Sequence, residues 1–94
     1  GFTTWFGVED YVYPKPHPEA YISLAKNLGI EKEDFENTWV FEDSLAGTTA
    51  AKKAGMVPIG ILTVYSETEL KAAGSQFVFP TLQEAYEYLQ AQNG

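Results

Sequence analysis

Two adjacent carboxylates, Glu42 and Asp43, stand where a short apolar run ends and a segment of small residues begins. Open α/β proteins bind ligands at the carboxyl ends of their parallel strands, and a strand that ends in acids fits that edge. At a strand end the chain turns, so two neighbouring side chains can reach one crevice. Because Mg²⁺ takes oxygen ligands and keeps several waters, the pair predicts a Mg²⁺-assisted phosphate site. The structural alternative is a cap, in which Asp43 or Ser44 satisfies the first amides of the following helix.

Lys15 lies between Pro14 and Pro16, which restrain the backbone around it. A stiff mount suits a lysine that must deliver its charge to a fixed point such as a phosphate. The alternative is an ordinary solvated lysine in a proline-rich turn. His17, the only histidine, is interpreted as a loop residue rather than a catalytic acid. Ser44 has no obvious base to activate it, so we interpret it as a helix cap or a hydrogen-bond donor to phosphate.

The segments that must position these residues alternate between strand and helix patterns at the spacing of βα units. Strands are expected at residues 2–6, 38–41, 57–64 and 77–79, and helices at 18–28, 46–54, 67–73 and 82–91. The third strand is apolar apart from Thr63, as expected of a strand that is covered on both faces. Ser66 with Glu69, and Thr81 with Glu84, fit the capping-box pattern of a helix start. The order predicts an α/β domain with a parallel open sheet between two layers of helices.

The composition limits the classes of partner and compartment. The 94 residues are 45% hydrophobic, which suffices for the core of one small domain. A net charge of −7 argues against nucleic acid or an anionic membrane as a partner. The apolar runs are far shorter than a membrane span, and the lack of Cys fits a reducing compartment. We therefore expect one cytoplasmic domain.

Two segments together resemble the haloacid dehalogenase-like hydrolase superfamily, in the branch of β-phosphoglucomutase-like enzymes and sugar-phosphate phosphatases. They are residues 15–21, with the sequence KPHPEAY, and residues 41–56, with the sequence FEDSLAGTTAAKKAGM. Their order, with a helix and a strand between them, is that of the family's core domain. The resemblance implies a Rossmann-like three-layer fold, Mg²⁺ as cofactor and a small phosphorylated metabolite as substrate.

The resemblance also implies a role for each candidate site residue. Lys15 would neutralise the nucleophile and the phosphoryl group. Asp43 would bind Mg²⁺, and Glu42 would be a further ligand, either directly or through water. Ser44 looks like the small polar residue that follows the acid pair in this branch, where it would contact the substrate phosphate.

The aspartates mark the largest departure from the family. In the family, the phosphoryl group passes to an aspartate of an Asp-x-Asp motif. The aspartates of this chain are Asp10, Asp34 and Asp43, and no two of them are two positions apart, so the motif is absent from residues 1–94. We therefore expect residues 1–94 to be only the carboxyl-terminal part of such a core, inactive alone, with the nucleophile strand and cap domain absent. The remainder of the core and the cap would be its partners. Without the first strand, residues 38–41 are expected to form an exposed apolar sheet edge.

Two further interpretations stay open beside the hydrolase. In one, the chain is a non-catalytic α/β module that pairs with another chain through its open sheet edge. In the other, it is a receiver-like domain in which Asp43 accepts phosphate. The second is disfavoured because the additional acids, Glu9 and Asp10, lie beside a different, peripheral element.

Overall fold

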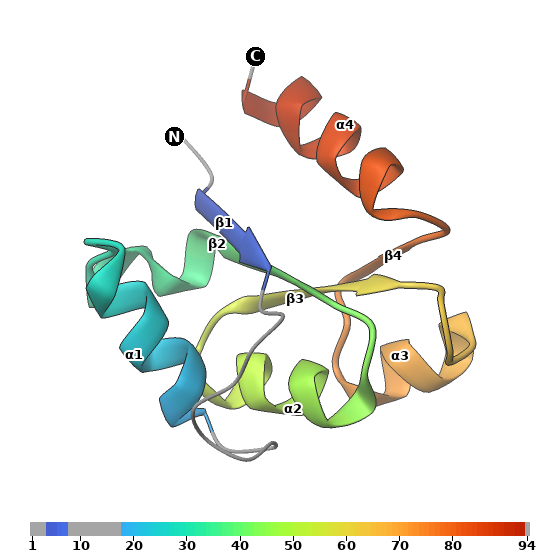
Figure 1. Cartoon of the computed structure of the whole chain (residues 1–94), viewed down its shortest axis with the longest axis horizontal. Helices are drawn as coiled ribbons and strands as arrows, with labels where there is room; N and C mark the ends of the chain where they lie inside the picture. Colours follow the sequence, from blue (N-terminus) through green and yellow to red (C-terminus); the bar gives the residue numbers. More distant parts are fainter. Residues whose placement is uncertain (1–3, 8–17, 94) are drawn as a thin grey trace.

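The computed structural model describes residues 4–7 and 18–93. Within these ranges strands and helices alternate along the chain (Figure 1). The elements are β1 (Thr4–Gly7), α1 (Glu19–Asn27), the 3₁₀ helix η1 (Lys32–Asn37), β2 (Thr38–Glu42), α2 (Leu45–Lys53), β3 (Val57–Ile61), α3 (Glu67–Ala73), β4 (Phe77–Phe79) and α4 (Leu82–Asn93). The four strands form one parallel sheet in the order β1-β2-β3-β4. The predicted α/β class and parallel open sheet are confirmed.

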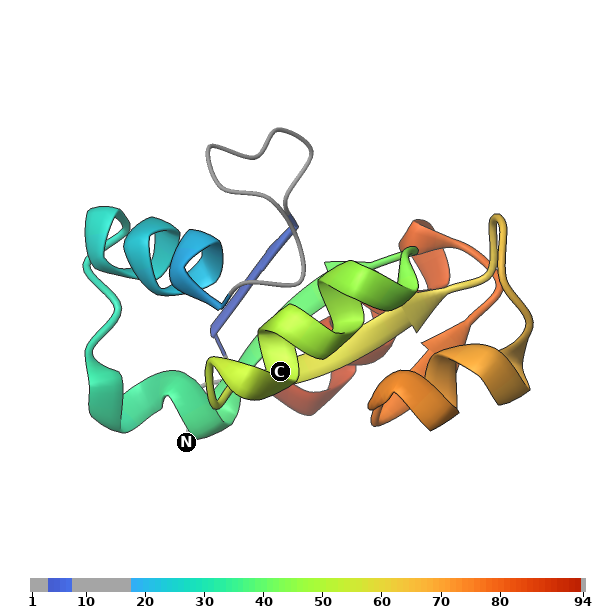
Figure 2. The ribbon, with the colours of Figure 1, turned by 90° about the horizontal axis from the view of Figure 1, so that it is seen from below.

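Helices cover both faces of the sheet. In Figure 1, α1, α2 and α3 lie below the sheet and α4 lies above it, and the view from below in Figure 2 places α2 in front of the strands. Along β2, Val40 belongs to the core on the α1 and α2 side, whereas Trp39 and Phe41 belong to the core on the α4 side. This alternation is the period of two that a strand covered on both faces requires. The three-layer arrangement is confirmed.

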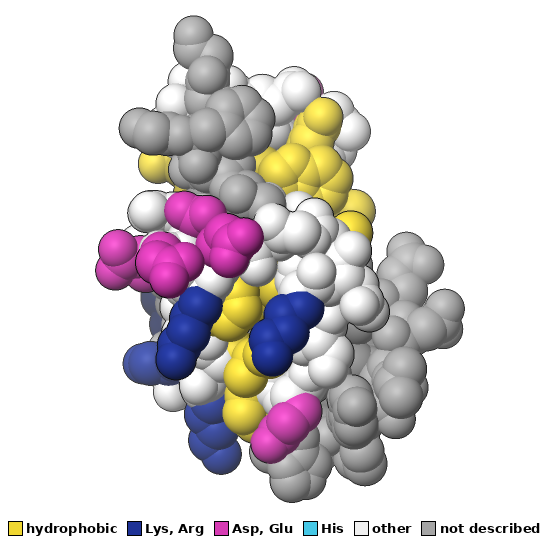
Figure 3. All heavy atoms as spheres, turned by 90° about the vertical axis from the view of Figure 1, so that its left-hand side faces the viewer, with side chains coloured by type: hydrophobic (Ala, Val, Ile, Leu, Met, Phe, Trp, Pro, Cys, Tyr) yellow, Lys and Arg dark blue, Asp and Glu magenta, His cyan; other side chains and the backbone are white. Residues whose placement is uncertain are grey.

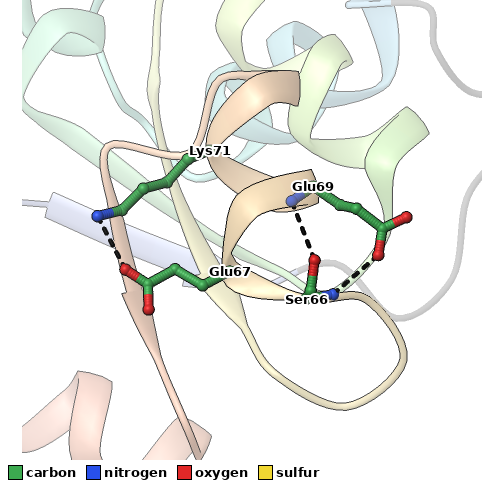
Figure 4. A network of polar contacts seen from close by, with 4 residues as sticks. All are labelled: Ser66, Glu67, Glu69 and Lys71. Atoms are coloured by element: carbon green, nitrogen blue, oxygen red, sulfur yellow. Dashed lines mark hydrogen bonds and ion pairs between the residues drawn. The ribbon is translucent and has the colours of Figure 1, made fainter.

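Local capping signals fix the ends of α3. The Ser66 hydroxyl accepts a hydrogen bond from the Glu69 amide at 3.2 Å, and the Glu69 carboxylate accepts one from the Ser66 amide at 3.1 Å (Figure 4). At the other end Gly74 adopts a φ of 125°, which side chains rarely tolerate. Glu67 and Lys71 add a surface ion pair one turn apart, at 2.9 Å. The predicted bounds of this helix, 67–73, are confirmed.

The expectation of an exposed apolar edge at residues 38–41 is wrong. Strand β1 pairs with β2 along that edge, in the register Thr4 to Thr38 through Gly7 to Phe41. The indole of Trp5 also lies 5.4 Å from the ring of Phe41, centroid to centroid. Hydrogen bonding and aromatic packing therefore join β1 to the strand that carries the acid pair, and β1 and β4 are the edges of the sheet.

Two smaller differences concern segments between the predicted elements. Strand β3 ends at Ile61 rather than Val64, because the chain turns there and the Thr63 amide bonds the Ile61 carbonyl. The helix η1 was not predicted, and its Phe35 is buried in the core on the α1 and α2 side of the sheet. The first difference follows from a local turn, whereas the burial of Phe35 depends on tertiary packing.

The surface beside α1 and η1 carries charges of both signs. Figure 3 shows acidic side chains grouped next to lysines on this face, rather than a separate basic patch. The acidic residues of η1, among them Glu33 and Asp34, are exposed. Among the residues that the structure describes, no helix has the length and apolar character needed to cross a bilayer.

Candidate functional site

The acid pair occupies the connection between β2 and α2, at the carboxyl end of the strand. Glu42 is the last residue of β2, and α2 begins at Leu45. Ser44 between them is the helix cap, and its hydroxyl accepts a hydrogen bond from the Gly47 amide at 2.9 Å. The capping interpretation is therefore confirmed for Ser44. Because α2 starts directly after the acids, the positive end of its dipole faces the same loop.

Glu42 is buried, with only 4% of its surface exposed. Its Oε2 accepts a hydrogen bond from the Tyr21 hydroxyl at 2.6 Å. Its Oε1 accepts from the Asp43 amide at 3.1 Å, from the Ser44 amide at 3.2 Å and from the Ser44 hydroxyl at 3.1 Å. A buried carboxylate needs such donors, because water no longer solvates its charge. A direct bond from Glu42 to a metal would compete with these contacts.

Gly47 makes room for that carboxylate in the first turn of α2. A Cβ atom added at this position would lie 2.2 Å from Cδ of Glu42 and 2.3 Å from its Oε2. Any side chain at position 47 would therefore overlap Glu42. The sequence shows a run of small residues after the acid pair, but nothing in that run predicted this contact.

Asp43 differs from its neighbour because its side chain is exposed. Its Oδ2 accepts a hydrogen bond from the hydroxyl of Thr63 at 3.0 Å, although the two residues are separated by 20 positions. Thr63 follows β3, the strand beside β2, so two adjacent strand ends bring the two side chains together. Thr63 was not predicted as a site residue, but it was the one polar residue noted in the apolar run 57–64.

The carboxylates at this edge of the sheet suit a metal ion that keeps part of its water shell better than one bound entirely by protein ligands. Within residues 4–7 and 18–93 no group of three or more His, Asp or Glu side chains is arranged to hold a metal ion. Mg²⁺ commonly binds through one or two carboxylates and keeps several waters, and the exposed Asp43 fits that requirement. Lys15 and His17 lie outside the described residues, so the predicted approach of Lys15 to Asp43 stays a prediction.

The sequence of the chain matches a known enzyme family. The family model described as "haloacid dehalogenase-like hydrolase" matches residues 1–55, which include the first motif and all but the last residue of the second. The chain belongs to the haloacid dehalogenase-like hydrolases. The predicted family is therefore confirmed.

Named relatives of this hydrolase family include phosphatases. Glycerol-1-phosphate phosphohydrolase 2 of Saccharomyces cerevisiae is 40% identical over 68 residues, which make up 68% of this chain and 27% of the relative. Validoxylamine A 7'-phosphate phosphatase of Streptomyces hygroscopicus subsp. limoneus is 35% identical over 65 residues, which make up 69% of this chain and 29% of the relative. The chain thus matches less than a third of the length of either relative.

Solved structures of the family share the fold. A hydrolase from Pseudomonas syringae superposes with a TM-score of 0.74 at 25% identity, over 87% of this chain and 38% of its own. A β-phosphoglucomutase from Clostridium difficile superposes with a TM-score of 0.67 at 28% identity, over 87% of this chain and 34% of its own. The strand-end loop described above therefore belongs to a Rossmann-like hydrolase fold, of which this chain matches a part.

Proposed function

We propose that the chain is the lysine- and metal-binding part of a Mg²⁺-dependent phosphoric monoester hydrolase or phosphomutase that acts on a small phosphorylated metabolite. The observation that carries the proposal is the exposed Asp43 carboxylate at the end of β2, on a loop fixed by the buried Glu42. Membership of the hydrolase family and the phosphatases among its relatives support the reaction class.

In this proposal Asp43 binds Mg²⁺ directly. Glu42 supports the metal site by fixing the loop that carries Asp43, or by binding a water of the ion, and does not contact the ion itself. The ion would supply charge neutralisation and a template for the phosphate oxygens. Lys15 would neutralise the phosphoryl group, since phosphoryl transfer depends mostly on positioning and charge stabilisation. Ser44 was predicted to contact the phosphate, but its hydroxyl already bonds Glu42 and the Gly47 amide, so we assign it to the cap.

The covalent acceptor would come from outside residues 1–94. None of Asp10, Asp34 and Asp43 stands two positions from another, so the chain holds no Asp-x-Asp motif. We propose that these residues form the carboxyl-terminal part of a core domain whose nucleophile strand and cap complete the site. The isolated chain would then be inactive. A cytoplasmic location and the lack of a nucleic-acid or membrane partner stay predictions.

The non-catalytic interaction module loses its main support. The open edge predicted at residues 38–41 is covered by β1, and the edges of the sheet are β1 and β4 instead. The match to the hydrolase family also favours the phosphatase over a receiver-like domain. We therefore propose only the hydrolase.

The test is phosphatase activity of the complete protein with Mg²⁺ and a panel of small phosphate esters. Asp43→Asn should abolish Mg²⁺ binding and activity, because it removes the ligand charge and keeps the shape. Asp34→Asn is the matched control, since Asp34 is exposed on η1. Full Mg²⁺ binding in Asp43→Asn, or turnover by residues 1–94 alone, would contradict the proposal.

A further inference from the structure

Tyr21 joins α1 to the strand end that carries the acid pair. Its side chain is completely buried in the core between α1, α2 and the sheet. Its hydroxyl nevertheless has a polar partner, the Oε2 atom of Glu42 at 2.6 Å. A short hydrogen bond to a buried carboxylate is among the stronger contacts of this kind, because the acceptor is charged and shielded from water.

The two oxygens of Glu42 divide their contacts between α1 and the loop. Oε2 bonds the Tyr21 hydroxyl, whereas Oε1 bonds the amides of Asp43 and Ser44. The carboxylate is a rigid plane, so a contact that fixes Oε2 also fixes the direction of Oε1. Loss of the hydroxyl would let the group rotate and would weaken the bonds that hold the backbone of Asp43.

Rigid elements surround this contact on two sides. The ring of Tyr21 packs with Ala25, Val40 and other buried residues of the first core. From α2, Gly47 lies so close to the carboxylate that a Cβ there would overlap it. Glu42 is therefore held between α1 and α2, and neither helix can shift without moving the carboxylate.

We propose that Tyr21 is a positioning residue that fixes the backbone of Asp43 through Glu42, and thereby the point from which the Asp43 side chain extends. The contacts stand independently, and the consequence for metal binding rests on the function proposed above. Tyr21 also lies on the helix that follows the Lys15 segment in the chain, so the same contact ties the acid loop to the element next to the lysine.

The experiment compares Tyr21→Phe with Tyr86→Phe in the complete protein. Both changes remove one hydroxyl and keep the ring, and the Tyr86 hydroxyl accepts a hydrogen bond from Gln90 at 2.9 Å on α4, across the sheet. Amide resonances and hydrogen exchange of Asp43 and Ser44 are measured without metal, and the Mg²⁺ dissociation constant is measured by calorimetry.

Tyr21→Phe should shift both amide resonances, reduce their protection and weaken Mg²⁺ binding by about 10-fold, the lower end of the range for losing a group bonded directly to a metal ligand, because Tyr21 acts on Asp43 only through Glu42. Tyr86→Phe should change neither. Unchanged amides and Mg²⁺ affinity in a folded Tyr21→Phe variant would overturn the proposal. If that variant does not fold, 3-fluorotyrosine at position 21 replaces it: a ¹⁹F resonance that moves on Mg²⁺ addition supports the coupling, and one that does not move overturns it.

The outcome separates this inference from the proposed function. If Asp43→Asn loses Mg²⁺ binding while Tyr21→Phe keeps it, the positioning role fails and the metal site stands. If Asp43→Asn keeps Mg²⁺ binding, the proposed function fails whatever Tyr21→Phe does.

Discussion

Substitution of Gly47 by alanine tests the packing around the acid pair most sharply. The added methyl group would lie 2.2 Å from Cδ of Glu42 and 2.6 Å from its Cγ, far inside van der Waals contact. Glu42 is buried beneath α2 and must therefore move. In doing so it gives up hydrogen bonds from Tyr21 and from the loop.

Two opposing contributions determine how much Gly47→Ala changes the free energy of unfolding. Alanine is favoured over glycine inside a helix by about 1 kcal/mol. Hydrogen bonds to a buried charged group contribute about 1.5–3 kcal/mol each, and two or more are lost. With two bonds lost, the net expectation is that Gly47→Ala lowers the free energy of unfolding by about 2 to 5 kcal/mol, measured by urea unfolding.

In a variant that already carries Glu42→Ala, the effect of Gly47→Ala on the free energy of unfolding should change sign. In Glu42→Ala the carboxylate that collides with position 47 is gone, so only the helix preference of alanine remains. There Gly47→Ala should raise the free energy of unfolding by about 1 kcal/mol relative to Glu42→Ala. Destabilisation of similar size in both backgrounds would refute the reasoning, because the cost would then have nothing to do with Glu42.

Two further predictions concern the lysine and a helix cap. Lys15→Ala in the complete enzyme should lower kcat/KM by about 10²- to 10³-fold, the range for losing one preorganised electrostatic group; an unchanged rate would make Lys15 an ordinary solvated lysine. Ser66→Ala should lower the free energy of unfolding by about 1 kcal/mol because the capping box is lost, whereas Lys71→Gln, which removes only the exposed ion pair with Glu67, should cost less than about 0.5 kcal/mol. Urea unfolding of both variants tests this comparison, and equal losses of stability in Ser66→Ala and Lys71→Gln would contradict the prediction.

Local sequence signals predicted the elements that local contacts define. Helix α3 begins and ends where expected, because Ser66, Glu69 and Gly74 form their contacts within the helix and its caps. The pairing of β1 with β2 was not foreseen, since it joins segments more than thirty residues apart, as the register of Thr4 with Thr38 illustrates. Strand pairing of this kind depends on the whole chain and not on any one segment.

The acid pair shows the same limit within the site. The sequence treats Glu42 and Asp43 as two similar carboxylates, but the structure buries the first and exposes the second. Tyr21 is buried, and the pattern of apolar residues says nothing of the partner of its hydroxyl. A hydrogen bond across 21 positions follows from how α1 packs on the sheet, which no spacing in the sequence reveals.

The central claim is that Asp43 holds a divalent cation at the end of β2. The most direct measurement is anomalous X-ray diffraction from crystals of the complete protein with Mn²⁺ in place of Mg²⁺. We expect an anomalous peak at bonding distance from a carboxylate oxygen of Asp43, with the Glu42 carboxylate still hydrogen-bonded to Tyr21. A peak on the exposed acids of η1, with none at Asp43, would contradict it.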